Sequence, residues 1–427
     1  MPLRAAPVPA APPTAPEALA ASAAPVTSAP VRHLRYLDGL RGLVALSIML
    51  RHNLPAFYPA LITGDPAVRH IARFPNLEMA FAGTPLDLVH GNSVGFCVFF
   101  VLSGFVLSEA YFNKPTLQTL QAKAATRYQR LMLPVFVSAL MGYLCMRLGL
   151  FFNHELAAVS GAAWYNKAWP TVPGIATLLK DLAVDLPLAG ETAYNPVLWM
   201  FHLELKGSFL VFVLLAFFAN FRHRGLVYGV AALLLVLGPF DSLLACFVVG
   251  VAINDFRHHG PRPQWWSARA RGLVVVALLL VFLVVATYPT TYFVGMTTSP
   301  YRYLQLPRLS PDYNELLYHC TAATLLLLAV LLSPRLQRLL QARWLLFLGS
   351  MSFGLYLMHF LVLGSFSSRL FLALLPHLGY HLSFAATMLA SAPLVLLSAY
   401  LFTRWVIRPN SRWAQRVYER WFKPMSS

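Results

Sequence analysis

The chain of 427 residues is too apolar to be an ordinary set of soluble domains. Hydrophobic residues make up 58% and charged residues 11% of it, whereas soluble domains are about 45–50% apolar and about 25% charged. The composition therefore favours a membrane protein with several spans. The net charge of +17 would suggest nucleic-acid binding in a soluble chain, but membrane proteins concentrate Lys and Arg in their cytoplasmic loops.

The first 31 residues are not expected to belong to the fold. They contain eleven Ala and eight Pro and no uninterrupted apolar run. Proline at this density prevents a helix, so we expect a disordered tail over residues 1–31 rather than a signal peptide.

Ten later segments are candidate membrane spans, which need about 20 mostly apolar residues. They are residues 37–58, 93–112, 131–152, 196–219, 225–239, 240–255, 272–288, 316–333, 344–366 and 383–406. The fifth and sixth are short, and a re-entrant pair is the alternative there. We expect an all-α integral membrane protein with about ten transmembrane helices, a membrane domain over 32–407 and a basic cytoplasmic tail over 408–427.

The basic residues give the expected orientation of these spans. With ten crossings and the N-terminus in the cytoplasm, 22 of the 33 Lys and Arg residues fall in cytoplasmic segments and seven in outer ones. This bias predicts that both termini are cytoplasmic. In one long outer loop, 153–195, Trp164, Tyr165 and Trp169 fit a polyol-binding face or the membrane interface, and we favour the interface.

The first span carries two polar residues that suggest chemistry. Arg41 and His52 are eleven residues apart, so they share one helix face about 16 Å apart along the axis. Such a stripe suits an elongated anionic cosubstrate, with Arg41 binding phosphate and His52 transferring a proton. The alternative is structural: Arg41 pairs with Asp38, and His52 bonds a backbone carbonyl.

Two further groups are candidates in the third and fourth spans. Arg127 and Arg130 are neighbours on one helix face and can hold a phosphate, or they are an ordinary cytoplasmic flank. Glu204 lies at the expected depth of His52, where a carboxylate would orient the imidazole. The alternative for Glu204 is an ion pair with His202 or Lys206.

The ninth span adds Tyr356 and His359 at the same expected depth. Ionisable residues from three spans at one level indicate a cavity within the membrane, and Asn53 follows His52 there. The sequence has no phosphate-binding glycine loop and no zinc-hydrolase motif. The four cysteines lie in apolar runs without ligand spacing, so we expect no metal site.

These residues resemble motifs of the membrane acyltransferase-3 family, whose members transfer acyl groups to sugars and other hydroxyl acceptors. The resemblance rests on Arg-Tyr-Leu-Asp-Gly-Leu-Arg-Gly at 35–42, the Arg-x10-His spacing of Arg41 and His52, Phe-Phe-Val-Leu-Ser-Gly-Phe at 99–105, Arg127-x-x-Arg130, Trp199 with Glu204, and 352–359. These motifs occur along the chain in the same order as in the family, and together they cover nearly the whole membrane region. The run after Glu204, Leu-Lys-Gly-Ser-Phe, departs from the bacterial pattern and is similar to fungal members.

The resemblance implies roles for the matched residues. His52 would be the general base or a transient acyl carrier, Glu204 would support it, and Arg41, Arg127 and Arg130 would bind the donor. Asn53, Tyr356 and His359 would line the substrate cavity. The donor would be acyl-CoA, in the first instance acetyl-CoA, and no metal or nucleic acid is implied.

The sequence analysis thus predicts a multi-pass O-acyltransferase of the plasma (inner) membrane. Its acceptor would be a hydroxyl of a carbohydrate, a glycolipid or another compound. The main alternative is a multi-pass transporter with a proton relay between His52 and Glu204, which leaves the cytoplasmic arginine pair unexplained. A non-catalytic membrane scaffold is the third hypothesis.

Overall fold

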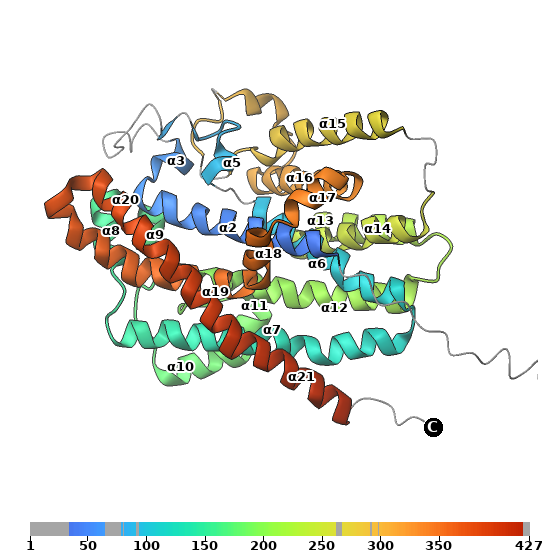
Figure 1. Ribbon diagram of the computed structural model, residues 1–427, viewed down its shortest axis with the longest axis horizontal. Helices are drawn as coiled ribbons and strands as arrows, with labels where there is room; N and C mark the ends of the chain where they lie inside the picture. Colours follow the sequence, from blue (N-terminus) through green and yellow to red (C-terminus); the bar gives the residue numbers. More distant parts are fainter. Residues whose placement is uncertain are drawn as a thin grey trace, which may run out of the picture. The chain divides into compact units, whose positions relative to one another are not determined.

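The computed structural model describes residues 34–64, 78–79, 81–90, 94–261, 267–290, 293–297 and 299–421. The expected tail over 1–31 lies outside these residues. Residues 34–427 form one compact unit. Every regular element in the described part is helical (Figure 1), which confirms the all-α prediction.

The first half of the unit contains two long central helices and a group of short helices. Its elements are α2 (Arg35–Phe57), α3 (Ala60–Thr63), α5 (Asp87–His90), α6 (Val94–Asn113), α7 (Leu117–Arg147), α8 (Asn153–Ser160), α9 (Ala163–Asn166), α10 (Ile175–Lys180), η2 (Asp181–Asp185), α11 (Leu186–Ala189), η3 (Pro196–Trp199) and α12 (Met200–Phe218). The short helices from α8 to α11 fill the loop between the third and fourth expected spans.

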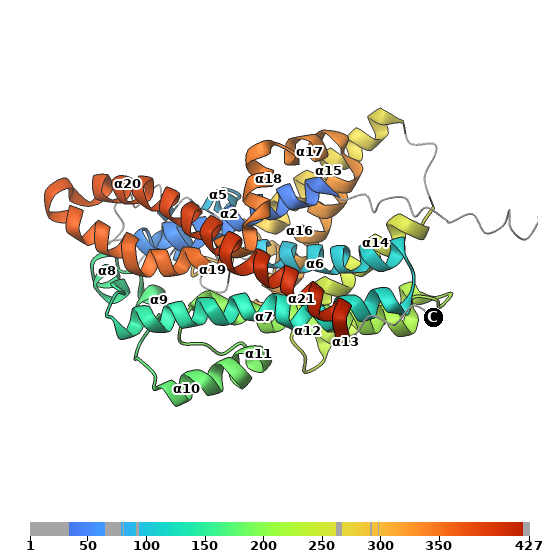
Figure 2. The same ribbon diagram turned by 60° about the horizontal axis from the view of Figure 1, so that its bottom comes forward.

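The second half ends in a nearly continuous helical run. Its elements are α13 (Arg224–Leu237), η4 (Ser242–Leu244), α14 (Ala245–His259), α15 (Ala268–Ala286), η5 (Pro300–Leu304), α16 (Pro311–Leu332), α17 (Pro334–Leu340), α18 (Arg343–Ser350), α19 (Ser352–Val362), η6 (Leu363–Ser367), α20 (Ser368–Phe402), η7 (Thr403–Ile407) and α21 (Arg408–Trp421). The expected cytoplasmic tail therefore begins as helix α21, which runs diagonally across the unit together with α20 (Figure 2).

Several helices have the length and composition of membrane spans, so the chain is a multi-pass membrane protein. Within the described residues six candidates meet both criteria: Val94–Asn113, Leu117–Arg147, Pro196–Phe218, Ala268–Ala286, Pro311–Leu332 and Ser352–Trp421. α2 has 23 residues but carries several charges. α13 has only 14 residues, and the expected ninth span is divided between α18 and α19. The count of ten stays a prediction.

Close backbone contacts fix α2 and α6 in the middle of the unit. A Cβ atom on Gly39 of α2 would lie 1.7 Å from the carbonyl oxygen of Leu340, and one on Gly104 of α6 would lie 2.0 Å from that of Phe247. Only glycine fits at such distances. α2 therefore packs directly against the end of α17 and against α18, and α6 packs against α14.

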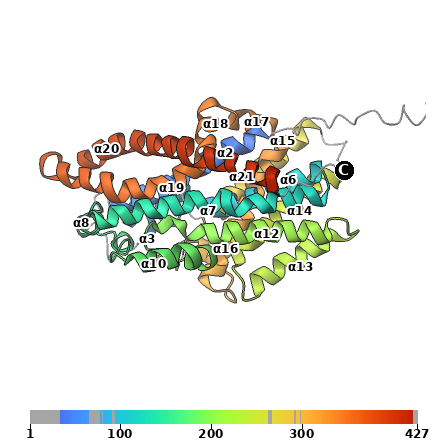
Figure 3. The same ribbon diagram turned by 90° about the horizontal axis from the view of Figure 1, so that it is seen from below.

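α7 and α12 form the wall next to α6. Figure 3 shows α7 beside α12, with α21 along the first half of α7. The Asn410 amide of α21 donates to the carbonyl oxygen of Gln129 over 3.0 Å, which ties the C-terminal helix to α7. Side chains from α2, α6, α7 and α12 meet inside this arrangement.

Candidate active site

The two polar residues of the first expected span lie on one helix. α2 is continuous from Arg35 to Phe57 and has a proline only near its end, Pro55. Arg41 and His52 are therefore about 16 Å apart along the axis, as the spacing predicts. Arg41 lies near the beginning of α2, and His52 lies near its end.

His52 bonds His359 of α19. The Nδ1 atom of His52 lies 3.0 Å from the carbonyl oxygen of Ile48 and 3.1 Å from Nε2 of His359. The Nδ1 atom of His359 lies 3.1 Å from the carbonyl oxygen of Leu355. The structure thus brings together the histidines of the first and ninth expected spans.

We assign the protons of the pair from these contacts. A carbonyl oxygen only accepts hydrogen bonds, so both Nδ1 atoms must carry a proton. Nε2 of His359 then accepts from Nδ1–H of His52. In this assignment both rings are neutral, and Nε2 of His52 keeps its lone pair.

Glu204 does not pair with His52 within the described residues, and the expected His–carboxylate pair is wrong. Its carboxylate forms an ion pair with Arg127 of α7 and accepts a hydrogen bond of 2.8 Å from Ser103 of α6. Trp199, five residues earlier, lines the same cavity as His52. Glu204 therefore lies about 7 Å farther along α12, toward the level of Arg41. The alternative partners His202 and Lys206 instead face Asp241.

The expected phosphate-binding arginines differ in their surroundings. Besides the Glu204 carboxylate, Arg127 donates from Nε to Ser208 Oγ over 2.7 Å. Arg41 lies 3.9 Å from the carboxylate of Asp38, and the charges of Glu204 and Arg127 also act on it. Arg130 is exposed. Arg127 is thus held inside the protein, whereas Arg130 is accessible.

A cavity of about 800 Å³ adjoins His52. Its walls come from the end of α2, the α8–α9 segment, the α13–α14 connection and the start of α16, and they include Arg51, His52, Phe96, Trp164, Lys167, Trp199, Asp312, Glu315 and His319. The ring of His52 lies 6.4 Å from that of Trp164. The cavity combines aromatic walls with charged groups of both signs, which suits a polar ligand with a large nonpolar face.

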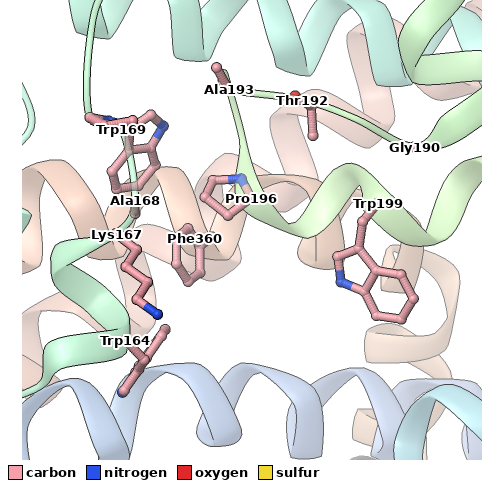
Figure 4. Close-up of a pocket in the computed structure, with 11 residues that line it drawn as sticks. Trp164, Lys167, Ala168, Trp169, Gly190, Thr192, Ala193, Pro196, Trp199 and Phe360 are labelled. Atoms are coloured by element: carbon pink, nitrogen blue, oxygen red, sulfur yellow. The ribbon is translucent and has the colours of Figure 1, made fainter.

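A second cavity of about 450 Å³ shares Trp164, Lys167 and Trp199 with the first. In Figure 4 these side chains and Phe360 surround a common space. Phe360 also meets the His52 ring edge-on at 5.3 Å. The two cavities therefore adjoin each other beside the His52–His359 pair.

Of the aromatic residues in the 153–195 loop, Tyr165 and Trp169 are buried within the protein and Trp164 lines both cavities, whereas the preferred interfacial position stays a prediction. Tyr165 is 0% exposed and Trp169 is 6% exposed. Trp169 donates to the carbonyl oxygen of Tyr194 over 2.9 Å, and burial raises the pKa of the Tyr165 hydroxyl. These rings pack inside the protein because the short helices α8 and α9 fold back over the end of α2.

Asn53 and Tyr356 line neither cavity, contrary to the cavity role expected for them. Asn53 donates to the carbonyl oxygen of Met49 over 2.8 Å, and Tyr356 donates to that of Val197 over 2.8 Å. Both side chains satisfy backbone acceptors in the interior. His359 is also absent from the cavity walls and meets the site through His52.

Sequence reasoning missed the partners that hold Glu204, and it named Trp164 and Trp199 without predicting that they line one site with Phe360. Ser208 lies one turn after Glu204, so the i, i+4 spacing was a usable signal. Ser103 appeared only within the family motif at 99–105, and no local signal pairs it with Glu204. No periodic signal marks Trp164, Trp199 and Phe360 as neighbours, because they come from separate elements.

The fold and the site define a multi-pass membrane enzyme with a buried histidine pair beside a substrate-sized cavity. The acyltransferase-3 family model, described as an acyltransferase domain, matches residues 34–418. The chain belongs to this family and is an acyltransferase of the O-acyltransferase type, which uses an acyl donor and an acceptor. The family match includes most of α21, beyond the expected domain boundary at 407.

Two similar proteins are also acyltransferases. Acyltransferase clz18 of Cochliobolus lunatus is 25% identical, over 90% of this chain and 95% of its own length. Acyltransferase R4 of a Phoma species is 26% identical, over 91% of this chain and 96% of its own length. No solved structure matches significantly.

Proposed function

We propose that this enzyme transfers an acyl group, acetyl in the simplest case, from acyl-CoA to a hydroxyl of a carbohydrate, glycolipid or similar acceptor, with His52 as the general base. The observation that carries the proposal is the hydrogen-bonded pair of His52 and His359 at the wall of the larger cavity. A neutral imidazole with a free Nε2 lone pair is the form that a general base requires.

The proposed transfer needs only one proton acceptor. Nε2 of His52 takes the proton of the acceptor hydroxyl while the oxygen attacks the thioester carbon. The carbon–sulfur bond breaks, and the proton passes from His52 to the departing CoA thiolate. The products are an ester and free CoA, and the imidazole returns to its neutral form.

A two-step route uses the same atoms. Nε2 of His52 attacks the thioester carbon first, the carbon–sulfur bond breaks, and CoA leaves as a thiolate. The hydroxyl oxygen then attacks the acyl-imidazolium, the carbon–nitrogen bond breaks, and the hydroxyl proton goes to the thiolate, so that the products are again an ester, CoA and a neutral His52. The geometry of His359 supports either route, because it holds Nδ1–H of His52 and directs Nε2 to the chemistry.

The two substrates would approach His52 from opposite directions. Arg41, with Arg127 and Arg130 near it, lies about 16 Å from His52 along α2, a spacing that suits a long arm between phosphates and a reactive thioester. The larger cavity is lined by segments that the charge bias assigns to the outer side. We therefore place the donor phosphates at the cytoplasmic side of the plasma (inner) membrane, with both termini in the cytoplasm, and the acceptor at the outer side.

Vesicles that contain the purified protein and radiolabelled acetyl-CoA test this proposal. We expect His52→Ala to lower CoA release and acceptor labelling by about 10²–10⁴-fold. His223→Ala is the matched control, because it removes an exposed histidine of the α12–α13 connection and should leave both rates unchanged. Equal rates for wild type and His52→Ala would refute the base and carrier roles.

A further inference from the structure

A groove between α7 and α21 contains basic residues that the site described above does not use. It has a volume of about 320 Å³, and its walls include Lys114 from the α6–α7 connection, Thr119 and Lys123 from the start of α7, and Tyr418 and Glu419 from α21. The structure fixes both walls: Thr119 Oγ1 donates to the carbonyl oxygen of Lys114 over 3.0 Å, and α21 is bonded to α7 near Gln129.

The groove continues the line of cations that begins at Arg41. Lys123, Arg127 and Arg130 are spaced by four and three residues, so they share one face of α7, and both arginine charges act on Lys123. Lys123 lies about 6 Å before Arg127 along the helix axis. The C-terminal end of α7 leads to α8 and α9, next to His52. Lys123 is therefore farther from His52 along α7 than Arg127 and Arg130 are.

Lys114 and Lys123 are available to an anion. Within the described part of the chain neither lysine has an ion-pair partner. The one acid of the groove, Glu419, accepts a hydrogen bond of 2.9 Å from Gln415. Arg127 differs, because the Glu204 carboxylate already compensates its charge. An arriving phosphate therefore meets uncompensated cations in this groove rather than at Arg127.

We propose that this groove binds the 3′-phosphate at the nucleotide end of the donor, an inference that rests on the proposed acyl-CoA donor. Acyl-CoA carries its thioester at one end, a diphosphate in the middle and a phosphomonoester on the ribose at the other end. The residues follow the same order: His52, then Arg41 with Arg130, then Lys123 with Lys114. A phosphomonoester carries nearly two negative charges, which two ammonium groups can balance.

Kinetics with two donors test the groove. In phosphatidylcholine vesicles, which offer no anionic headgroup, acetyl-CoA is compared with 3′-dephospho-acetyl-CoA. For the wild type, we expect loss of the 3′-phosphate to raise KM about tenfold, the cost of losing charge-assisted hydrogen bonds. Lys114→Met/Lys123→Met should raise KM for acetyl-CoA by a similar factor and leave KM for the dephospho donor unchanged.

Two further variants add a charge reversal within the groove and a control outside it. Lys123→Glu should raise KM for acetyl-CoA further, because it places a carboxylate against the phosphate. Arg412→Met removes one basic charge from α21 outside the groove and should change neither KM, so it controls for net charge.

Three results would overturn the inference. The first is a wild type that treats both donors alike, and the second is a lysine variant that raises both KM values equally. The third is a KM that changes when phosphatidylglycerol is added to the vesicles but not when the donor loses its 3′-phosphate. That result would assign the groove to a lipid headgroup. Absence of turnover with every acyl-CoA would instead overturn the proposed donor, and this inference with it.

Discussion

The two ends of α2 balance their polar groups in different ways. At the His52 end, called the neutral end after its two uncharged imidazoles, these rings bond each other and the carbonyl oxygens of Ile48 and Leu355. The charges at this end, Arg51 among them, line the adjoining cavity. At the Arg41 end, the groups are charged, and Glu204 and Arg127 compensate each other. A buried charge is costly unless it is paired. The charged side chains at the Arg41 end therefore pair with each other. The neutral end keeps one lone pair free, which is why we place the chemistry there.

The largest expected effect comes from removing one charge of the ion pair at the Arg41 end of α2. Glu204→Ala removes the partner of Arg127 and leaves a guanidinium uncompensated in the interior, so we expect a loss of about 3–5 kcal/mol of stability. Thermal unfolding in detergent measures it. Glu204→Gln/Arg127→Met removes both charges and should recover part of the loss; a double variant as unstable as Glu204→Ala would show that the pair is not the stabilising element.

A smaller effect is expected at the neutral end. His359→Gln keeps a polar side chain but no longer fixes the His52 ring through an imidazole acceptor, so kcat should fall about 10–100-fold, as for other orienting partners. The donor KM should stay within about twofold, because His359 lies outside both cavities and far from the phosphates. A change in KM alone would contradict a positioning role.

The smallest effect is expected at Arg130. It is exposed and has no carboxylate partner within the described residues, so its contact with the donor is a solvated one. Arg130→Ala should raise the donor KM by about three- to tenfold and leave kcat and thermal unfolding unchanged. An unchanged KM would show that Arg130 does not contact the donor. The donor phosphates would then be assigned to the other cations near the Arg41 end of α2.

The sequence predicted the long helices well where one apolar run makes one helix. The expected spans 93–112 and 196–219 correspond to α6 and to η3 with α12. The expected span 131–152 missed the first part of α7, because the helix begins at Leu117 with a polar and then basic stretch that carries no continuous apolar signal. The expected span 344–366 is broken at Met351, where Gly349 packs against the carbonyl oxygen of Asp38; this contact between distant segments leaves no local signal.

For the site, the sequence predicted a shared helix face but not every depth. The spacing of Arg41 and His52 correctly placed them on one helix. His52 and His359 were expected to face one cavity; in the structure they bond each other, and His359 lies outside the walls of both cavities. Glu204 was misplaced because helical rise does not fix rotation, and because η3 lies at the level of His52 within the protein. The catalytic and binding roles of all these residues stay predictions.

Donor binding and turnover measured on one preparation of His52→Ala test the central claim most directly. Equilibrium binding of labelled acetyl-CoA should stay within about twofold of wild type, because the donor phosphates lie about 16 Å from His52. Acyl transfer in the same vesicles should fall by about 10²–10⁴-fold. Transfer at the wild-type rate with donor bound would contradict the account that His52 performs the proton or acyl transfer.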